Sequence, residues 1–289
     1  MMSGPFLSTT LAAQVLLMAG TEKQKAEWLP KLTAGARATL ATTALKSSYD
    51  PADITASATK NGDDLVLSGT KILVTDAHTA DLIIATILID GDLTLALLDK
   101  RVIEDGSLQR EIVIDETRAS FAVTLDGLKI HKSDLLDPER TELAIAHLHL
   151  AANLLLAAEM CGGAQSCIDY TLDYLKTRKQ FGKEIGAFQA LKHPIVEAYC
   201  DYEKARSHLY SAAWCFHDPR RGEIAVRMAK TQADKAFSYA ADRAIQFHGG
   251  FGFTYECDAQ LYRRRAMWCS AQHGDATYHK ARLAELLLD

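Results

Sequence analysis

A helical pattern that runs from Asp137 to the C-terminus constrains the fold more than any other feature of this sequence. Apolar residues recur along it at helical spacing, and short segments with glycine or proline interrupt it. Pro219 and Gly249 mark two of these breaks. Long helices joined by short connections favour an antiparallel four-helix bundle over residues 136–289. The helices are predicted over about 138–178, 186–217, 220–248 and 256–287.

The residues before this region divide into a helical segment and a β-rich segment. Residues 1–35 look helical, with Thr21 as a plausible N-cap. Residues 36–135 instead carry short β-rich runs, with hairpin turns at Asn61–Asp64 and Asp90–Asp92. No helical pattern separates the runs, so an antiparallel barrel or sandwich is predicted rather than βαβ units. The runs are 65–69, 81–89, 93–98, 111–114 and 119–125.

Composition excludes several classes of function. The net charge of −5 gives no basic field for nucleic acid. The longest apolar runs are too short to span a bilayer, and no secretory signal opens the chain. The six cysteines form no CxxC pair, so we expect reduced, packing thiols, no metal site and a cytoplasmic protein. The triplet Arg263–Arg265 points in different directions on a helix, which favours a solvated or interface role.

Two glycine-bearing helix ends carry the chemistry. The first is the run from Arg178 to Gly186, Arg-Lys-Gln-Phe-Gly-Lys-Glu-Ile-Gly, and the second runs from Gln246 to Thr254. Arg178 offers a fork of donors to a phosphate oxygen, and Phe181 offers a flat apolar face. Glycines permit close backbone approach to a bulky ligand. In this order, the two runs resemble the C-terminal flavin-binding signatures of the acyl-CoA dehydrogenases. The resemblance implies FAD, with cofactor contacts from Arg178, Phe181, Gln246, Gly249 and Gly250.

The order of helix, β segment and four helices is also similar to the acyl-CoA dehydrogenase fold, over nearly the whole chain. The implied fold is an α+β multidomain chain, with a partial N-terminal helical domain (1–35), a β-barrel middle domain (36–135) and a C-terminal four-helix bundle (136–289). Most of the usual N-terminal domain has no counterpart here. A chain that begins at this point leaves part of the acyl cavity unwalled, so another subunit covers it or the cavity is wide. A mis-set start codon is the third explanation.

The departures from the family pattern fall on the flavin side. The usual Thr-Glu-Pro-Gly-x-Gly-Ser-Asp turn is replaced by Thr43–Asp50, Thr-Ala-Leu-Lys-Ser-Ser-Tyr-Asp, which keeps the ends and loses the glycines. Side chains there would crowd or reshape the turn. The usual Trp-Ile-Thr reads Leu73–Thr75, so the aromatic that flanks the flavin ring is absent. Thr75 could still donate a hydrogen bond and is carried over as a cofactor contact.

The catalytic base is missing from both of its family positions. The family reaction removes an α-proton of an acyl-CoA and needs a carboxylate in a dry site. The usual Glu-Gly-Thr turn reads His273-Gly274-Asp275, and the alternative position falls at Ala152 or Asn153. The remaining acidic candidates are weak: Asp275, which is better explained as an N-cap, and Glu159. We expect His248 and His273 to be hydrogen-bonded structural residues.

This asymmetry resembles the non-catalytic subunit of a heteromeric acyl-CoA dehydrogenase, of the kind found in actinobacterial enzymes for steroid or other bulky acyl-CoA thioesters. The resemblance implies a homologous partner subunit in an α2β2 arrangement, an acyl-CoA substrate and an electron-transfer flavoprotein as acceptor. FAD would be shared across the interface, with assembly through the third and fourth helices. One alternative is an active homo-oligomeric enzyme with a non-standard base. The other is a flavin-free scaffold or binding protein.

Overall fold

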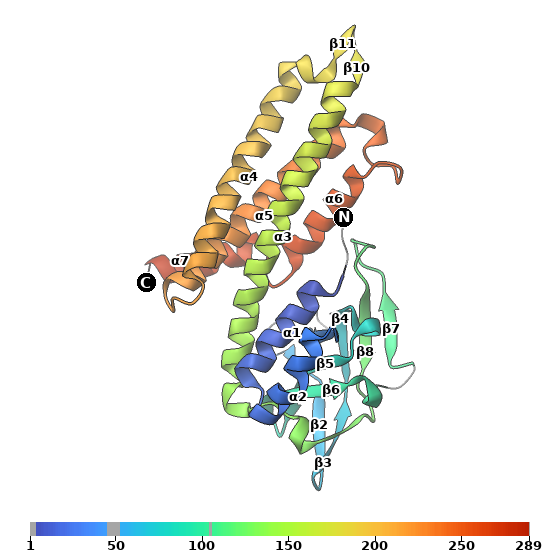
Figure 1. The fold of residues 1–289 in the computed structure, drawn as a ribbon, viewed down its shortest axis with the longest axis vertical. Coiled ribbons are helices and arrows are strands. Elements are labelled where there is room, and N and C mark those ends of the chain that lie inside the picture. Colours follow the sequence, from blue (N-terminus) through green and yellow to red (C-terminus); the bar gives the residue numbers. More distant parts are fainter. Residues whose placement is uncertain (1–3, 45–52, 104–105, 289) are drawn as a thin grey trace. The chain divides into compact units, whose positions relative to one another are not determined.

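The computed structural model describes residues 4–44, 53–103 and 106–288. The chain divides into two compact units, residues 2–151 and 152–289, and the boundary falls inside helix α3 (Thr141–Thr177). N-terminal helices, a β-sheet region and a C-terminal helical region follow one another along the chain (Figure 1), which confirms the predicted α+β class. The predicted division at residues 35 and 135 stays a prediction.

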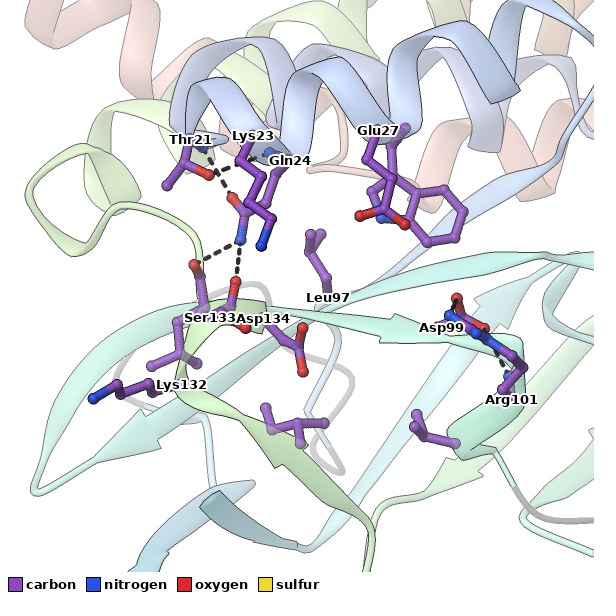
Figure 2. Close-up of a pocket in the computed structure, with 14 residues that line it drawn as sticks. Thr21, Lys23, Gln24, Glu27, Leu97, Asp99, Arg101, Lys132, Ser133 and Asp134 are labelled. Carbon is purple, nitrogen blue, oxygen red and sulfur yellow. Dashed lines mark hydrogen bonds and ion pairs between the residues drawn. The ribbon is translucent and has the colours of Figure 1, made fainter. Parts of the chain in front are cut away.

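Two helices open the first unit, α1 (Phe6–Ala19) and α2 (Glu22–Thr33). Thr21 caps α2 as predicted: its hydroxyl accepts from the Gln24 amide at 3.3 Å, and the Gln24 side chain accepts from the Thr21 amide at 2.9 Å. The Gln24 side-chain nitrogen also donates to the carbonyls of Ser133 and Leu135, at 2.8 and 2.9 Å (Figure 2). Gln24 therefore fastens α2 to the chain that follows the last strand of this unit.

Two sheets form the middle of the unit. The larger has the order β1-β5-β2-β3-β9, with β6 also paired to β5, and the smaller has the order β4-β8-β7. Both predicted hairpin turns are present, at Gly62 and at Asp90-Gly91, where the backbone takes the positive φ of a tight turn. The strands are β1 (Ala38–Ala41), β2 (Ser57–Asn61), β3 (Asp64–Ser68), β4 (Thr70–Thr75), β5 (Leu82–Ile89), β6 (Asp92–Asp99), β7 (Leu108–Glu111), β8 (Ser120–Thr124) and β9 (Lys129–His131).

The strand directions and one strand position differ from the sequence prediction. β5 pairs in parallel with both β1 and β2, so the larger sheet is mixed rather than antiparallel. A hydrophobic pattern indicates which face of a strand is buried but not which way a neighbour runs. The predicted strand at 111–114 is wrong: β7 ends at Glu111, and the next residue, Ile112, is 97% exposed.

The core of this unit lies between the two sheets. Apolar side chains from both sheets pack into one cluster, with Ile83, Ile87 and Leu98 from the larger sheet and Val74 and Phe121 from the smaller. A lysine lies among them. Lys71 in β4 is fully buried, its ammonium donates to the Thr86 hydroxyl at 2.8 Å, and burial lowers its pKa to about 8.

The second unit is helical. After α3 come a two-stranded hairpin, β10 (Lys179–Gln180) and β11 (Lys183–Glu184), then α4 (Gln189–Cys215) and α5 (Arg221–Phe247). Figure 1 shows α4 alongside α3 and α5. The prediction of one continuous fourth helix over 256–287 is wrong. The structure has two helices there, α6 (Ala259–Ala271) and α7 (Ala276–Leu288). The break contains Gly274 with φ +101°, a conformation that ends helices.

Close packing between α3 and α5 depends on one glycine. A Cβ added to Gly163 in α3 would lie 2.5 Å from the Phe237 ring of α5, which is far inside contact distance. Phe237 is fully buried and belongs to an apolar stripe along α5. The stripe recurs at helical spacing and consists of Val226, Ala229, Lys230, Ala233, Phe237, Ala240 and Ala244.

Helix α3 is the longest helix in the described part of the chain. Judged by length and composition alone, residues 138–177 are long and apolar enough to cross a membrane. The sequence prediction did not anticipate this, because it judged all apolar runs too short to span a bilayer. Half of the apolar window of α3 is buried inside the protein. Two cysteines of this helix are also packed inside: burial raises the pKa of Cys161 to about 11 and of Cys167 to about 12. These thiols stay protonated at neutral pH.

Candidate cofactor-contact site

The first motif forms a tight hairpin at the end of α3. The Arg178 amide donates to the Tyr174 carbonyl at 2.9 Å, and the Ile185 amide closes the hairpin on the Arg178 carbonyl at 2.8 Å. Phe181 and Gly182 form the two-residue turn, with φ of 55° and 78°. Positive φ is costly for phenylalanine, so the fold around the turn holds it there. The Phe181 ring is 90% exposed and projects as an apolar face from the tip.

The second motif ends α5. Gln246 lies in the last turn of the helix, and Gly249 follows with φ +62°. Gly252 is required by space: a Cβ there would lie 2.3 Å from the Ile245 carbonyl oxygen. The chain therefore turns sharply back on the helix end, and the Gln246 side chain and the backbone of Gly249 and Gly250 are left at the surface.

His248 brings the two motifs together. Its ring stacks on Tyr174, one turn before Arg178, at a centroid distance of 4.2 Å, and on Tyr170 at 5.0 Å. Its Nδ1 lies 2.8 Å from the Ala244 carbonyl, which can only accept, so Nδ1 carries a proton. Burial lowers the pKa of His248, against the opposing effect of that hydrogen bond, and favours the neutral ring. The prediction that His248 is structural is confirmed, and it holds the ends of α3 and α5 side by side.

The predicted contact residues of this unit lie at that shared end and are exposed. Their chemistry fits an anionic dinucleotide: a guanidinium and a carboxamide can bind phosphate or base edges, open glycine backbone permits close approach, and Phe181 offers an aromatic face. A site built this way leaves its ligand open on one side. The residues are Arg178, Phe181, Gln246, Gly249 and Gly250.

The flavin-side candidates belong to the unit that contains the sheets. Thr75 ends β4 and is half-buried, and its carbonyl accepts from the Thr39 hydroxyl at 2.6 Å. Leu73, where the family usually has tryptophan, has φ 56° at a bulge in β4, and its amide donates to Glu111 at 2.8 Å. Of the predicted turn at 43–50, Thr43 and Ala44 are buried after β1, and residues 45–50 lie outside the described residues.

The two positions at which the family places its base meet in this structure. The Asn153 side-chain nitrogen donates to the His273 carbonyl at 3.3 Å, across 120 residues of sequence. Asn153 is buried, and its neighbour Ala152 is fully buried. Neither an amide nor an alanine can take the proton. His273 has φ 53° in the turn between α6 and α7, and its backbone carbonyl has a structural role, whereas the prediction for its side chain stays a prediction.

Both acidic candidates have structural partners. The carboxylate of Glu159 lies 2.5 Å from the guanidinium of Arg265, which is only 4% exposed. The expectation that the arginine triplet is solvated or at an interface is therefore wrong for Arg265. The Asp275 carboxylate accepts from the Tyr278 amide at 2.8 Å, which confirms it as the N-cap of α7.

Sequence reasoning missed the group that shapes this turn. Lys230 in α5 is buried, and its ammonium lies within 3.3 Å of the carbonyl oxygens of Cys269, Ser270, Gln272 and Gly274. Burial lowers its pKa to about 8. Nearby, His279 is fully buried and accepts from the Arg227 guanidinium at 3.1 Å. Burial, followed by the charges of Lys230 and Arg227, lowers the His279 pKa to about 4. The sequence signal that could have revealed this group is the position of Lys230 among the apolar residues of the α5 stripe, which predicts a buried ammonium.

One cavity lies apart from these residues, within the unit of the sheets. It measures about 500 Å³ and lies between α2 and the end of β6, with Trp28, Leu97 and Ile130 among its lining residues (Figure 2). Its polar rim is largely engaged in internal contacts: Gln24 binds two carbonyls, and Arg101 pairs with Asp99 at 2.7 Å. None of its lining residues is a predicted site residue.

Comparison with known proteins places the chain in a family. The profile described as "Acyl-CoA dehydrogenase, C-terminal domain" matches residues 142–288. The short/branched chain specific acyl-CoA dehydrogenase of Bos taurus is 28% identical over 269 residues, which are 90% of this chain and 62% of that one. Acyl-CoA dehydrogenase IpdE2 of Mycobacterium tuberculosis is 42% identical over 125 residues, 43% of this chain and 36% of that one. This chain thus spans less than two thirds of either relative.

A solved structure gives the same relationship over nearly the full length. A variant of the Tcur3481-Tcur3483 steroid ACAD has a similar structure, with a TM-score of 0.81 and 27% identity, over 98% of this chain and 76% of that one. The family profile covers just over half of the chain, and the fold, the two helix-end motifs and the relatives agree with it. The chain belongs to the acyl-CoA dehydrogenase family.

Proposed function

We propose that this chain is the non-catalytic component of a heteromeric, FAD-dependent acyl-CoA dehydrogenase. It contributes cofactor contacts to a site shared with a homologous subunit and supplies no base. The observation that carries the proposal is a contrast within the helical unit. The two helix-end motifs lie side by side and exposed, held together by the stack of His248 on Tyr174. At the two positions where the family places its base, the chain has only the Asn153 amide, which donates to the backbone carbonyl of His273.

The residues that would hold FAD follow from their chemistry. Arg178 would bind a phosphate oxygen, Gln246 would bind a polar edge, and Gly249 and Gly250 would let the ligand approach the backbone. Phe181 would cover an apolar face. FAD, when bound, supplies the hydride acceptor for the desaturation. Because these groups are exposed, a second subunit completes the enclosure of the ligand, and the homologous partner would supply the carboxylate that removes the α-proton.

The substrate class is part of the same proposal. IpdE2 is named an acyl-CoA dehydrogenase, and the solved relative is named a steroid ACAD. We infer a bulky, steroid-derived acyl-CoA thioester as substrate and an α2β2 complex as the assembly. By resemblance, an electron-transfer flavoprotein would reoxidise the flavin.

The alternative of an active homo-oligomer requires a base from this chain. Glu159 is engaged by a buried arginine, and Asp275 is engaged at a helix N-terminus, so neither is held in a dry site against a substrate. This contrast favours the heteromer.

The test is the FAD content of the chain purified alone and co-purified with its homologous subunit. Half a flavin per chain in the complex, and none in the chain alone, supports the proposal. Full occupancy alone would favour the homo-oligomer, and no flavin in either preparation would favour a scaffold. In the complex, Arg178→Ala should weaken FAD binding about tenfold to a hundredfold, since a charge-assisted hydrogen bond is lost. Arg220→Ala, an exposed arginine at the opposite end of α5, is the matched control.

A further inference from the structure

The cavity between α2 and the end of β6, in the unit that contains the sheets, has an apolar base. Its volume of about 500 Å³ lies in the range of small-molecule sites. Leu97 of β6 and Ile130 of β9 line it and are buried, and the Trp28 indole of α2 joins them. The Lys31 ammonium lies 4.2 Å from the centre of the Trp28 ring and covers one of its faces. A ligand in this cavity would therefore rest an apolar group on these side chains.

Trp28 also carries a hydrogen-bond donor that the protein leaves open. The side chain is only 7% exposed, and among the residues that the structure describes no group accepts a hydrogen bond from its indole nitrogen. An indole N–H can only donate, and a buried donor without an acceptor is costly. The nitrogen is not sealed from solvent, so a ligand in the cavity that Trp28 lines can reach it. An acceptor on that ligand would satisfy the donor.

Within the described ranges, the mouth of the cavity offers a free ammonium and a free carboxylate oxygen. Lys23 of α2 is exposed and has no ion pair or hydrogen bond to any described residue. Asp134 accepts from the His131 amide at 2.9 Å through one oxygen, and its other oxygen has no partner in the same ranges. Figure 2 shows Lys23 on α2 and Asp134 on the facing wall, in the turn after β9. The two groups present opposite charges to a ligand between them.

The other charged side chains of the lining already have partners. Each forms an ion pair at 2.7 or 2.8 Å: Arg101 with Asp99, Lys132 with Asp63 and Glu27 with Lys31. The lining as a whole has as many cations as anions, so no net field favours a phosphate or a polyamine. A neutral ligand that carries both charges matches the free ammonium and the free carboxylate oxygen. Together with the apolar base, this match favours a zwitterion with an apolar body.

We propose that this cavity binds an α-amino acid with an apolar side chain. The carboxylate of the amino acid would accept from the Lys23 ammonium and the Trp28 indole, and its ammonium would donate to the free oxygen of Asp134. Its side chain would lie on Leu97 and Ile130. None of these residues is a predicted cofactor contact, so the inference goes beyond the proposed function and is independent of it.

The first test is isothermal titration calorimetry of the full-length chain with L-leucine and with L-phenylalanine. We expect a single site per chain with a dissociation constant of about 0.1 mM, since so small a ligand has few atoms to bind. Isocaproate keeps the body of leucine without the ammonium, and isopentylamine keeps it without the carboxylate, so each should bind at least about tenfold more weakly. No saturable binding of either amino acid at millimolar concentration would overturn the proposal. So would isocaproate binding as tightly as leucine, which would make the cavity a simple carboxylate site.

Substitutions at the mouth of the cavity test the assigned contacts. Lys23→Met keeps the aliphatic stem and removes the ammonium, and Asp134→Asn keeps an acceptor for the His131 amide and removes the charge. Each should weaken leucine binding at least about tenfold. Lys132→Met is the matched control, because the Lys132 ammonium pairs with Asp63 and points away from the cavity in Figure 2, so the affinity should stay within about twofold. Equal losses in Lys23→Met and Lys132→Met would contradict the proposal.

Fluorine NMR locates the ligand in the chain. Trp28 is the only tryptophan of the unit that contains the sheets, and Trp214 and Trp268 belong to the helical unit. With fluorotryptophan incorporated, leucine should shift the Trp28 resonance, which Trp28→Phe identifies, and leave the resonances of the helical unit in place. A shift confined to Trp214 or Trp268, or no shift at saturating leucine, would refute the site.

Discussion

Glu159→Gln separates a structural carboxylate from a catalytic one. The substitution keeps the shape of the side chain and removes the charge that faces the buried Arg265 guanidinium at 2.5 Å. Breaking a buried ion pair by removing one partner costs about 3–5 kcal/mol. The Glu159 side chain keeps 25% of its exposure, so solvent screens part of the interaction, and the amide oxygen of glutamine can still accept a hydrogen bond. We therefore expect a loss of about 2 kcal/mol in the free energy of unfolding.

The assay is urea denaturation followed by far-ultraviolet circular dichroism. Removing both charges, in Glu159→Leu/Arg265→Met, should recover most of the loss, because no uncompensated charge then remains buried. Turnover of the assembled complex with Glu159→Gln should stay within about tenfold of wild type, whereas loss of a general base costs roughly 10²–10⁴. A thousandfold drop in kcat with flavin bound and stability unchanged would make Glu159 the base and refute the structural assignment.

Three further outcomes follow from the same helical unit. Asp275→Asn should leave the melting temperature nearly unchanged, since asparagine also caps helices, and should keep the turnover within about tenfold of wild type; a thousandfold loss of kcat would instead make Asp275 the base. The lowered pKa of His279 predicts acid destabilisation, because the unfolded chain binds a proton near pH 6.5 that the folded chain resists until about pH 4. Stability should fall by up to about 3 kcal/mol as pH drops through this window, and His279→Gln should flatten the slope of unfolding free energy against pH. Gly252→Ala should cost about 1–3 kcal/mol in thermal unfolding, because its Cβ meets the Ile245 carbonyl, whereas Gly250→Ala has open space and should cost little; equal losses would contradict the packing.

Local signals in the sequence predicted the elements whose causes are local. The Thr21 cap, the two hairpin turns and the long helices were found because capping, positive φ and helical spacing act over a few residues. The parallel pairing of β5 with β1 could not be found this way, since strand direction is decided by chain connections and by packing between the sheets. The division of the last helix was partly predictable. Asp275 was identified as an N-cap, which indicates the start of a new helix, but a single helix was still predicted over 256–287.

The sequence names the residues of the candidate site, whose role as cofactor contacts stays a prediction, but it does not reveal the residues that support them. Arg178, Phe181 and Gln246 stand in motifs that can be recognised from sequence, and the structure places them at one end of the helical unit. The stack of His248 on Tyr174 joins residues 74 positions apart, and the Lys230 contacts join residues about 40 apart. Such pairings depend on how α3, α5 and α6 pack, which a single sequence does not encode in any local pattern.

The contact between Gly163 and Phe237 sets the axial register of α3 against α5. The ring occupies the space that a side chain at residue 163 would need, so a larger residue there would push α3 and α5 apart or shift one along the other. Gly163 lies about 16 Å along α3 from Tyr174, at 1.5 Å per residue. A slip of one turn, about 5.4 Å, would carry Tyr174 off the His248 ring and separate the two motif ends. If the proposed function holds, a substitution at Gly163 should weaken flavin binding, although Gly163 is not among the predicted cofactor contacts.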